Sequence, residues 1–237
     1  MKRIETQVDG FNLTSFQRIR SDSDPIHVYI EGDGLAWITR AQPSADPTPR
    51  YAIALSLALK DDAPNVVYMA RPCQYNMYKS ARCESAYWTD RRFSEEVVAA
   101  MGHELDILVP ETPAPRIELV GYSGGAAIAV LLAARRSDVI SLRTVAGNLD
   151  HVAVNRYHNV SAMPGSLNAA DFARQLSHLP QIHFSGQQDQ IIPRQITQNF
   201  VQQVGRCAKQ VDLPDASHTN GWTDAWTSLL RVKPQCI

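Results

Sequence analysis

The sequence predicts an α/β fold: a mainly parallel, twisted sheet with helices on both faces, in a single domain spanning residues 1–237. Two observations carry this prediction. Short apolar runs of strand length alternate along the chain with Ala- and Leu-rich segments of helix length, as in sheets whose parallel strands are joined by crossover helices. With 237 residues and 44% hydrophobic side chains, the chain can also bury one sizeable core.

The first three strands are predicted from alternation and turn residues. Residues 4–19 alternate apolar and polar side chains around Asp9-Gly10, which predicts a hairpin of two edge strands. After a polar break, the apolar run 26–30 predicts a third strand. This strand leads directly into the loop Glu31-Gly32-Asp33-Gly34, whose glycines allow close backbone approaches.

The next elements are a helix over 51–60, a strand over 65–70 and an irregular stretch from 71 to 93. A loop of that length is usually functional when it is ordered, and its aromatic side chains and cysteines favour order. Ser94 stands at the N-cap position of a following helix with glutamates in its first turn. The apolar face of that helix consists of Val97, Val98, Met101, Leu105 and Leu108.

The stretch Gly121-Tyr122-Ser123-Gly124-Gly125 joins a short apolar run, bounded by prolines, to an Ala/Leu-rich segment. A strand, a Gly-x-Ser-x-Gly turn and a helix are the context of a nucleophile elbow. The chain must reverse within a few residues and hold the serine in a strained conformation at the tip, so residues without a Cβ are needed on both sides. A plain strand-to-helix turn without chemistry is the alternative interpretation.

The alternation of strands and helices continues to the end of the chain. The predicted elements are strand 138–147, a helix near 169–176, strand 181–185, helix 193–204, strand 210–213 and a closing helix over 219–232. The connection after the first of these strands is long, with Pro164-Gly165 in its middle. Together with residues 71–93, it is expected to frame an open site, which aromatic side chains could line: Tyr75, Tyr78, Tyr87, Trp88 and Tyr157.

This organisation resembles the α/β-hydrolase fold over nearly the whole chain, and the modest length leaves no room for a large lid domain. In that fold the catalytic order is serine, acid, histidine. Ser123 is followed by Asp189, in a turn resembling the acid-bearing turn of the fold, and by His218 after the final strand. The resemblance implies that His218 takes the proton of Ser123 while Asp189 orients the imidazole.

Other residues compete for these roles. Asp150 follows an earlier strand and is the substitute acid, because some proteins of this fold place the acid there. His151 and His158 lie in the long connection and could touch a substrate, but they precede Asp189, which is the wrong order for the base. A turn-forming role for Asp189 and a surface or capping role for His218 remain the non-catalytic alternatives.

The resemblance also assigns an oxyanion hole to the backbone N–H groups of Gly124 and Asp33. Many proteins of this fold carry His-Gly where this chain has Glu31-Gly32. A carboxylate at Asp33 would put negative charge near a developing oxyanion, so only its backbone can help. The side chain of Asp33 is therefore expected to point elsewhere.

Three blocks resemble more closely a group of bacterial α/β hydrolases that are often made with an export or lipoprotein signal and have no settled substrate. The blocks are Ile30–Trp37, Ala70–Tyr75 and Tyr87–Phe93. The likeness implies a periplasmic or otherwise exported protein. The first six residues hold Lys2 and Arg3 with no apolar stretch behind them, so they predict no signal peptide, and a cytoplasmic location is the alternative.

The four cysteines agree with export. Cys73 and Cys83 flank the irregular loop, while Cys207 and Cys236 lie where the last strand and the tail could meet. An even number in such places suggests the disulfides Cys73–Cys83 and Cys207–Cys236 and an oxidising compartment. Four reduced thiols in a cytosolic enzyme are the alternative.

Composition narrows the function. A formal net charge of −1 argues against a dominant nucleic-acid partner, and no apolar run approaches the length of a membrane span. Motifs for metals, dinucleotides or nucleotide phosphates are absent, so no cofactor or metal is expected. The sequence therefore predicts a serine hydrolase acting on a small acyl substrate, first of all a carboxylic ester. An amidase or peptidase with the same three residues, or a non-catalytic binding or envelope protein, are the alternatives; oligomeric state is not predicted.

Overall fold

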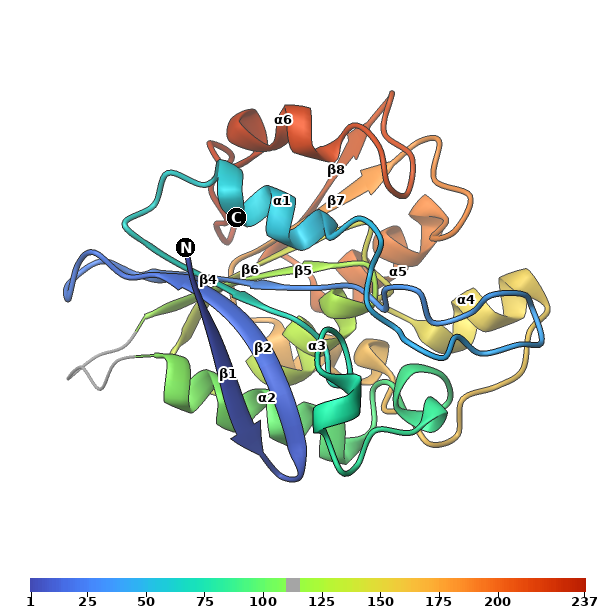
Figure 1. The fold of residues 1–237 in the computed structure, drawn as a ribbon. Coiled ribbons are helices and arrows are strands. Elements are labelled where there is room, and N and C mark those ends of the chain that lie inside the picture. Colours follow the sequence, from blue (N-terminus) through green and yellow to red (C-terminus); the bar gives the residue numbers. More distant parts are fainter. Residues whose placement is uncertain (110–115) are drawn as a thin grey trace.

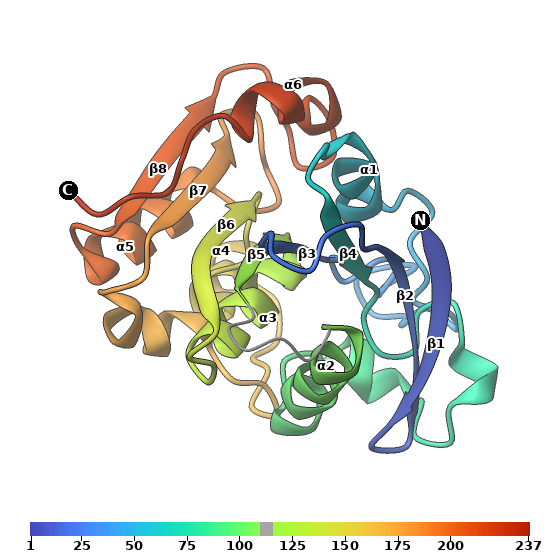
Figure 2. The same cartoon turned by 90° about the vertical axis from the view of Figure 1, so that its left-hand side faces the viewer.

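An eight-stranded sheet forms the centre of the computed structural model, which describes residues 1–109 and 116–237 (Figures 1 and 2). The prolines that bound the predicted strand before Ser123 (Pro110, Pro113 and Pro115) lie outside the described residues. The strands are β1 Lys2–Val8, β2 Phe11–Arg18, β3 Ile26–Ile30, β4 Asn65–Met69, β5 Ile117–Tyr122, β6 Val139–Val145, β7 Gln181–Gly186 and β8 Ala208–Leu213.

The strand order in the sheet is β1-β2-β4-β3-β5-β6-β7-β8. β1 pairs with β2 and β2 with β4 in antiparallel fashion, and every other neighbouring pair is parallel. The predicted hairpin is present, but the prediction of two edge strands is wrong for β2, which is paired on both sides. The burial of β2 agrees with this inner position, since Phe11, Leu13 and Ser15 are fully buried. Alternation of apolar and polar residues does not reveal whether a strand has a second neighbour.

Helices cover both faces of the sheet, as predicted (Figure 2). One face carries α1 and α6, and the other carries α2, α3 and α5, each with its own buried apolar cluster. The helices are α1 Ile53–Lys60, α2 Glu95–Leu108, α3 Gly124–Ala133, α4 His151–His158, α5 Arg194–Val204 and α6 Trp222–Leu229; the 3₁₀ segments are Met77–Lys79, Ser85–Trp88 and Ala169–Leu176. Every residue of α3 is buried, which explains why its sequence has no polar face.

The connection after β6 differs from the prediction. It contains α4, which lies beyond the carboxyl ends of the strands (Figure 1), where only irregular chain was expected. This helix is short and mostly polar, and it starts at Asp150, whose side chain accepts a hydrogen bond from Ala153 N. The helix predicted over 169–176 is a 3₁₀ helix, and Ser94 stands at the N-cap of α2 without a side-chain capping bond.

The carboxyl ends of the parallel strands carry the loops that matter for function. No large inserted lid covers this edge in the part of the chain that the structure describes (Figure 1). Within the same residues, no helix is both long enough and apolar enough to cross a membrane.

Candidate active site

The turn between β5 and α3 places Ser123 at its tip with φ 51° and ψ −119°. Residues other than glycine rarely adopt this backbone conformation, which costs on the order of 1–3 kcal/mol and persists only where packing enforces it. The packing is visible at the flanking glycines. A Cβ at Gly121 would lie 2.4 Å from Ala126 Cα, and one at Gly125 would lie 2.2 Å from Ile30 O. The Gly-x-Ser-x-Gly spacing is thus a steric requirement of this turn.

Three side chains that lie far apart in the sequence form a continuous hydrogen-bonded chain. Ser123 Oγ lies 3.0 Å from His218 Nε2, and His218 Nδ1 lies 2.9 Å from Asp189 Oδ2. The other carboxylate oxygen of Asp189 accepts hydrogen bonds from the N–H groups of Ile191 (2.8 Å) and Ile192 (2.9 Å). The Asp189 side chain is 1% exposed, so its carboxylate is buried and its position is fixed by these hydrogen bonds.

The loop that carries His218 is fixed by two aromatic residues. Tyr122 Oη donates to His218 O (3.1 Å), and Trp222 Nε1 donates to the same oxygen (3.0 Å). The Tyr122 ring also packs against the imidazole at an interplanar angle of 39°, with centroids 5.5 Å apart. Burial raises the pKa of Tyr122 well above its usual value, so its hydroxyl remains a donor. Neither residue was predicted to act in the site, although each is close to a motif: Tyr122 precedes the serine, and Trp222 follows the histidine by four positions.

The substitute acid, Asp150, has other partners. Its Oδ1 accepts from Ala153 N (3.0 Å) and from Asn168 Nδ2 (3.1 Å), so it caps α4 and ties the helix to the segment after it. His158 Nε2 contacts Ile191 O at 2.7 Å. His151 is 4% exposed and lies beside Phe93, with ring centroids 5.9 Å apart.

The backbone N–H groups of Asp33 and Gly124 form no hydrogen bond within the described chain. The Asp33 side chain was expected to point away from the oxyanion site, and it does not. Its carboxylate lies against Gly124, where an added Cβ would be 2.0 Å from Asp33 Oδ1. Its charge is instead balanced by two guanidiniums, with Arg71 Nη1 at 3.2 Å and Arg92 Nη1 at 3.4 Å. Burial lowers the pKa of Arg71 to about 10, so it stays charged at neutral pH. Two cations thus outweigh one carboxylate here.

The side chain of Glu31 holds the start of the loop that carries Asp33. This buried carboxyl group accepts from Gly32 N (2.9 Å) and from Tyr68 Oη (3.2 Å). Burial raises the pKa of Glu31 to about 7. Glu31 therefore anchors the backbone one residue before the amide of Asp33, in the position where a His-Gly pair is common in the fold that the sequence resembles.

The segment 71–93, which supplies both arginines, is tied down at its first turn. Cys73 and Cys83 form a disulfide with Cα atoms 5.6 Å apart, and Cys207 and Cys236 form a second at the end of the chain. Arg71 also donates to the backbone carbonyl of Arg92, which joins the two ends of the segment. Neither arginine was predicted as a site residue, although both lie in the blocks Ala70–Tyr75 and Tyr87–Phe93 that carry the closer resemblance.

The site has no further recognisable chemistry among the described residues. No group of three or more His, Cys, Asp or Glu side chains there could hold a metal ion. Of the five aromatic residues considered as pocket walls, Tyr87 and Trp88 are buried in the core, while Tyr78 and Tyr157 are 89% and 63% exposed. None of the five lines the pocket described below.

Several solved structures have a similar fold over almost their whole length. Est1E from Butyrivibrio proteoclasticus superposes with a TM-score of 0.66 at 13% identity, covering 98% of each chain. An alpha-beta serine hydrolase homologue from Coxiella burnetii gives 0.65 at 16% identity, covering 97% of this chain and 93% of that one. The esterase domain of a Rhodothermus marinus protein gives 0.64 at 15%, covering 96% and 93%.

These similarities establish that the chain has the α/β-hydrolase fold, as its sequence pattern suggested. At such low identity they establish the fold alone. No family model matches the sequence, and no curated protein matches it.

Proposed function

We propose that this chain, built on the α/β-hydrolase fold, is a serine hydrolase that cleaves a carboxylic ester through an acyl-serine intermediate. The proposal rests on one observation, the hydrogen-bonded chain from Ser123 through His218 to Asp189, with distances of 3.0 and 2.9 Å. A hydroxyl, an imidazole and a carboxylate linked in this order are the signature of nucleophilic catalysis, in which they act as nucleophile, base and orienting group. The esterases and serine hydrolases among proteins of similar shape agree with it.

In the proposed reaction Ser123 Oγ attacks the ester carbonyl carbon while His218 Nε2 takes its proton. Asp189 holds Nδ1–H and stabilises the imidazolium that forms. The tetrahedral intermediate then collapses: the bond to the alcohol breaks, and the alcohol leaves with the proton from His218. Water, deprotonated by the same imidazole, attacks the acyl carbon, the bond from that carbon to Ser123 Oγ breaks, and His218 returns the proton to Oγ as the acid leaves.

The negative charge on the carbonyl oxygen would be met by the N–H groups of Gly124 and Asp33. Loss of one such donor typically costs about 3–4 kcal/mol in the barrier. The carboxylate of Asp33 opposes this stabilisation, and the guanidiniums of Arg71 and Arg92 offset it. The charge balance around the loop therefore allows an aspartate at a position where it would otherwise raise the barrier.

We also propose that the chain works in an oxidising compartment, such as a bacterial periplasm. The support is the two cysteine pairs at disulfide distance, because such bonds persist mainly outside the reducing cytosol. The natural partner of the site would be a small acyl substrate.

A fluorophosphonate probe tests the hydrolase proposal. Folded wild-type protein should be labelled at Ser123, and labelling should disappear in Ser123→Ala and His218→Ala. Turnover of p-nitrophenyl esters should then exceed turnover of aminoacyl anilides. Absence of labelling would favour a binding protein on a hydrolase scaffold, and faster cleavage of the anilides would replace the ester with an amide.

A further inference from the structure

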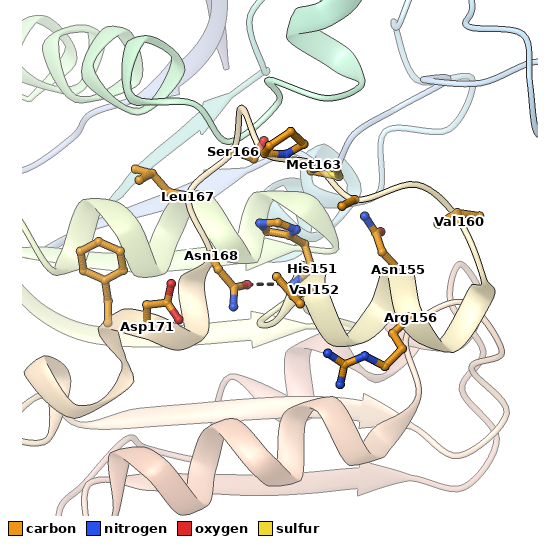
Figure 3. Close-up of a pocket in the computed structure, with 13 residues that line it drawn as sticks. His151, Val152, Asn155, Arg156, Val160, Met163, Ser166, Leu167, Asn168 and Asp171 are labelled. Atoms are coloured by element: carbon orange, nitrogen blue, oxygen red, sulfur yellow. Dashed lines mark hydrogen bonds between the residues drawn. The ribbon is translucent and has the colours of Figure 1, made fainter.

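A pocket of about 660 Å³ opens between α4 and residues 160–172 (Figure 3). Apolar side chains dominate its walls, among them Val160, Met163, Leu167 and Phe172. Pockets of this size and character, with a few polar groups, are the usual sites for small organic ligands. The steps of the proposed reaction at Ser123 give this pocket no role.

The pocket contains one buried polar side chain that lacks a partner. His151 lines the wall and is 4% exposed, yet neither ring nitrogen makes a hydrogen bond within the described chain, although the backbone of Ser166 lies close to the ring. Figure 3 shows the ring extending from the start of α4 toward Met163 and Ser166. A buried polar group without a partner costs about 1–3 kcal/mol, which a ligand could recover.

The charges around the pocket favour a neutral ligand. Arg156 and Asp171 on its wall have opposite charges, and Asp150 beside it is occupied as a helix cap. Burial lowers the pKa of His151, and the nearby Arg92 lowers it further, so the ring is neutral at neutral pH. A neutral imidazole has one donor and one acceptor nitrogen, which suits a hydroxyl group. Charged ligands would lose hydration against mostly apolar walls.

Two connections join the pocket to the nucleophile. Asn148 N donates to Ser123 O (2.9 Å), and His151 follows three residues later. Arg92 reaches in both directions, with Nη1 3.4 Å from Asp33 Oδ2 and Nη2 3.1 Å from Met163 Sδ. Asp33 contacts Gly124, next to the serine, and Met163 lines the pocket. The pocket and the nucleophile are therefore neighbours in the fold, linked through Asn148 and Arg92.

We infer that this pocket binds the acyl group of the ester, that the group is apolar, uncharged and bears a hydroxyl, and that His151 hydrogen-bonds that hydroxyl. The inference rests on the proposed function for its placement on the acyl side. It identifies a substrate class, esters of hydroxylated arylalkanoic or similar acids, and makes His151 a specificity-determining residue.

The kinetic test compares p-nitrophenyl 3-(4-hydroxyphenyl)propanoate with its analogue that lacks the hydroxyl. Wild type should prefer the hydroxylated ester about 5- to 10-fold in kcat/KM, as expected for one neutral hydrogen bond. His151→Phe, which keeps an aromatic ring beside Phe93, should reduce this ratio to about 1 and leave hydrolysis of p-nitrophenyl acetate unchanged. His103→Phe, on exposed α2 surface, is the matched control.

A second variant tests the pocket itself. Ala162 lines it and is exposed, so Ala162→Trp should fold normally while filling the space. We expect a loss of at least 10-fold in kcat/KM for both arylpropanoate esters and none for the acetate. A preference for the hydroxyl that survives His151→Phe, or arylpropanoate turnover unchanged by Ala162→Trp, would overturn the inference.

A binding measurement separates this inference from the hydrolase proposal. Calorimetric titration with 4-propylphenol needs no turnover; it should bind wild type and Ser123→Ala alike and at least 5-fold more weakly to His151→Phe. Binding with that pattern and no ester turnover would refute the hydrolase and keep the pocket. Ester turnover without such binding would refute the pocket and keep the hydrolase.

Discussion

Asp189 and Asp150 both follow a strand of the parallel sheet, and only their partners distinguish them. Asp189 contacts His218 Nδ1 at 2.9 Å, whereas Asp150 accepts from a helix N-terminus and from Asn168. We predict that Asp189→Asn lowers kcat by about 10³- to 10⁴-fold, because an amide facing Nδ1 favours the wrong tautomer. Asp150→Asn should keep near-wild-type kcat and cost about 1 kcal/mol or less of stability.

Ester kinetics and denaturant titration of both variants check this prediction. Since Asn remains a good N-cap, Asp150→Ala gives the larger stability loss and serves as a control for the cap. A collapse of kcat in Asp150→Asn, with Asp189→Asn nearly unaffected, would move the orienting role to residue 150.

Gly124 is the second residue whose role can be isolated. A Cβ there would lie 2.0 Å from Asp33 Oδ1, and Arg71 and Arg92 hold that carboxylate in place. Gly124→Ala should therefore displace the loop that carries the second oxyanion donor and lower kcat about 10²-fold or more. Adding Asp33→Gly removes the obstructing carboxylate, so the double variant should be faster than Gly124→Ala alone.

Gly125 provides the matched comparison. A Cβ at this position would meet backbone, with Ile30 O at 2.2 Å and Glu31 O at 2.4 Å, so removing the Asp33 side chain cannot relieve it. Gly125→Ala should stay impaired with or without Asp33→Gly. Equal recovery in both pairs, measured as kcat on folded protein, would contradict the steric argument.

At the scale of elements, α2 contains a buried acid that its amphipathic pattern does not explain. The predicted apolar face is buried, and Glu104 is buried with it at 0% exposure. Neither carboxyl oxygen makes a well-formed hydrogen bond in the described chain, although the Ser15 hydroxyl lies close, and burial raises the pKa of Glu104 to about 8. Position 104 follows Met101 by three residues and Ala100 by four, so helical geometry places it on the apolar face whatever its charge.

This acid predicts a pH-dependent stability. The unfolded chain releases the Glu104 proton near pH 4.5, whereas the folded chain keeps it until about pH 8. The folded state therefore binds more protons between these values, and stability falls as pH rises across that window. Glu104→Met should be more stable than wild type by an amount that grows with pH to on the order of 5 kcal/mol near pH 9.

Urea titrations at pH 5, 7 and 9 measure this difference. Glu31, with a pKa near 7, titrates in both proteins, so its contribution cancels in the comparison. Glu95→Gln, on the exposed start of the same helix, should show no comparable growth with pH. A Glu104→Met advantage that is the same at all three pH values would mean that Glu104 titrates normally.

Elements also mark where sequence patterns stop being informative. α3 was predictable because it is apolar on all sides and follows a recognisable turn, and the parallel strands because each is a short apolar run between breakers. α4 was not, because only three of its eight residues are buried and its N-cap aspartate was read as a candidate acid. The pairing of β2 with β4 depends on the order of strands in space, which local alternation does not encode.

For the whole molecule, the sequence predicted the α/β-hydrolase fold because motif, turn and element order all agree with it. Ser123, Asp189 and His218 could be proposed as partners since the fold brings strand ends to one edge. Arg71 and Arg92 could not, because their contacts form between loops whose conformations follow no sequence periodicity. His151 was proposed only as a possible substrate contact, and the pocket around it was not predicted. The prediction that the Asp33 carboxylate points away from the site was wrong. Its compensating charges come from Arg71 and Arg92, which are 38 and 59 positions away in the sequence.

The two disulfides are expected to affect the stability of the whole chain, and one of them also the site. Cys73–Cys83 closes the loop that supplies Arg71 and Arg92, while Cys207–Cys236 ties the tail to the start of β8, far along the sheet from Ser123. Replacing either pair by serines should lower the free energy of unfolding by about 2–4 kcal/mol. Only the Cys73→Ser/Cys83→Ser variant should also lower kcat/KM, because the arginines that balance Asp33 lose their anchor.

Denaturant titration and ester kinetics on the two double variants separate these effects, and mass measurement of unreduced wild type tests the premise. The unreduced chain should be lighter than the reduced one by four hydrogen atoms, and we expect it to unfold in one transition, as the predicted single domain would. Four free thiols in protein made under oxidising conditions would refute both disulfides and the argument for export. Equal loss of kcat/KM in both variants would mean that the segment 71–93 holds its arginines in place without the bond.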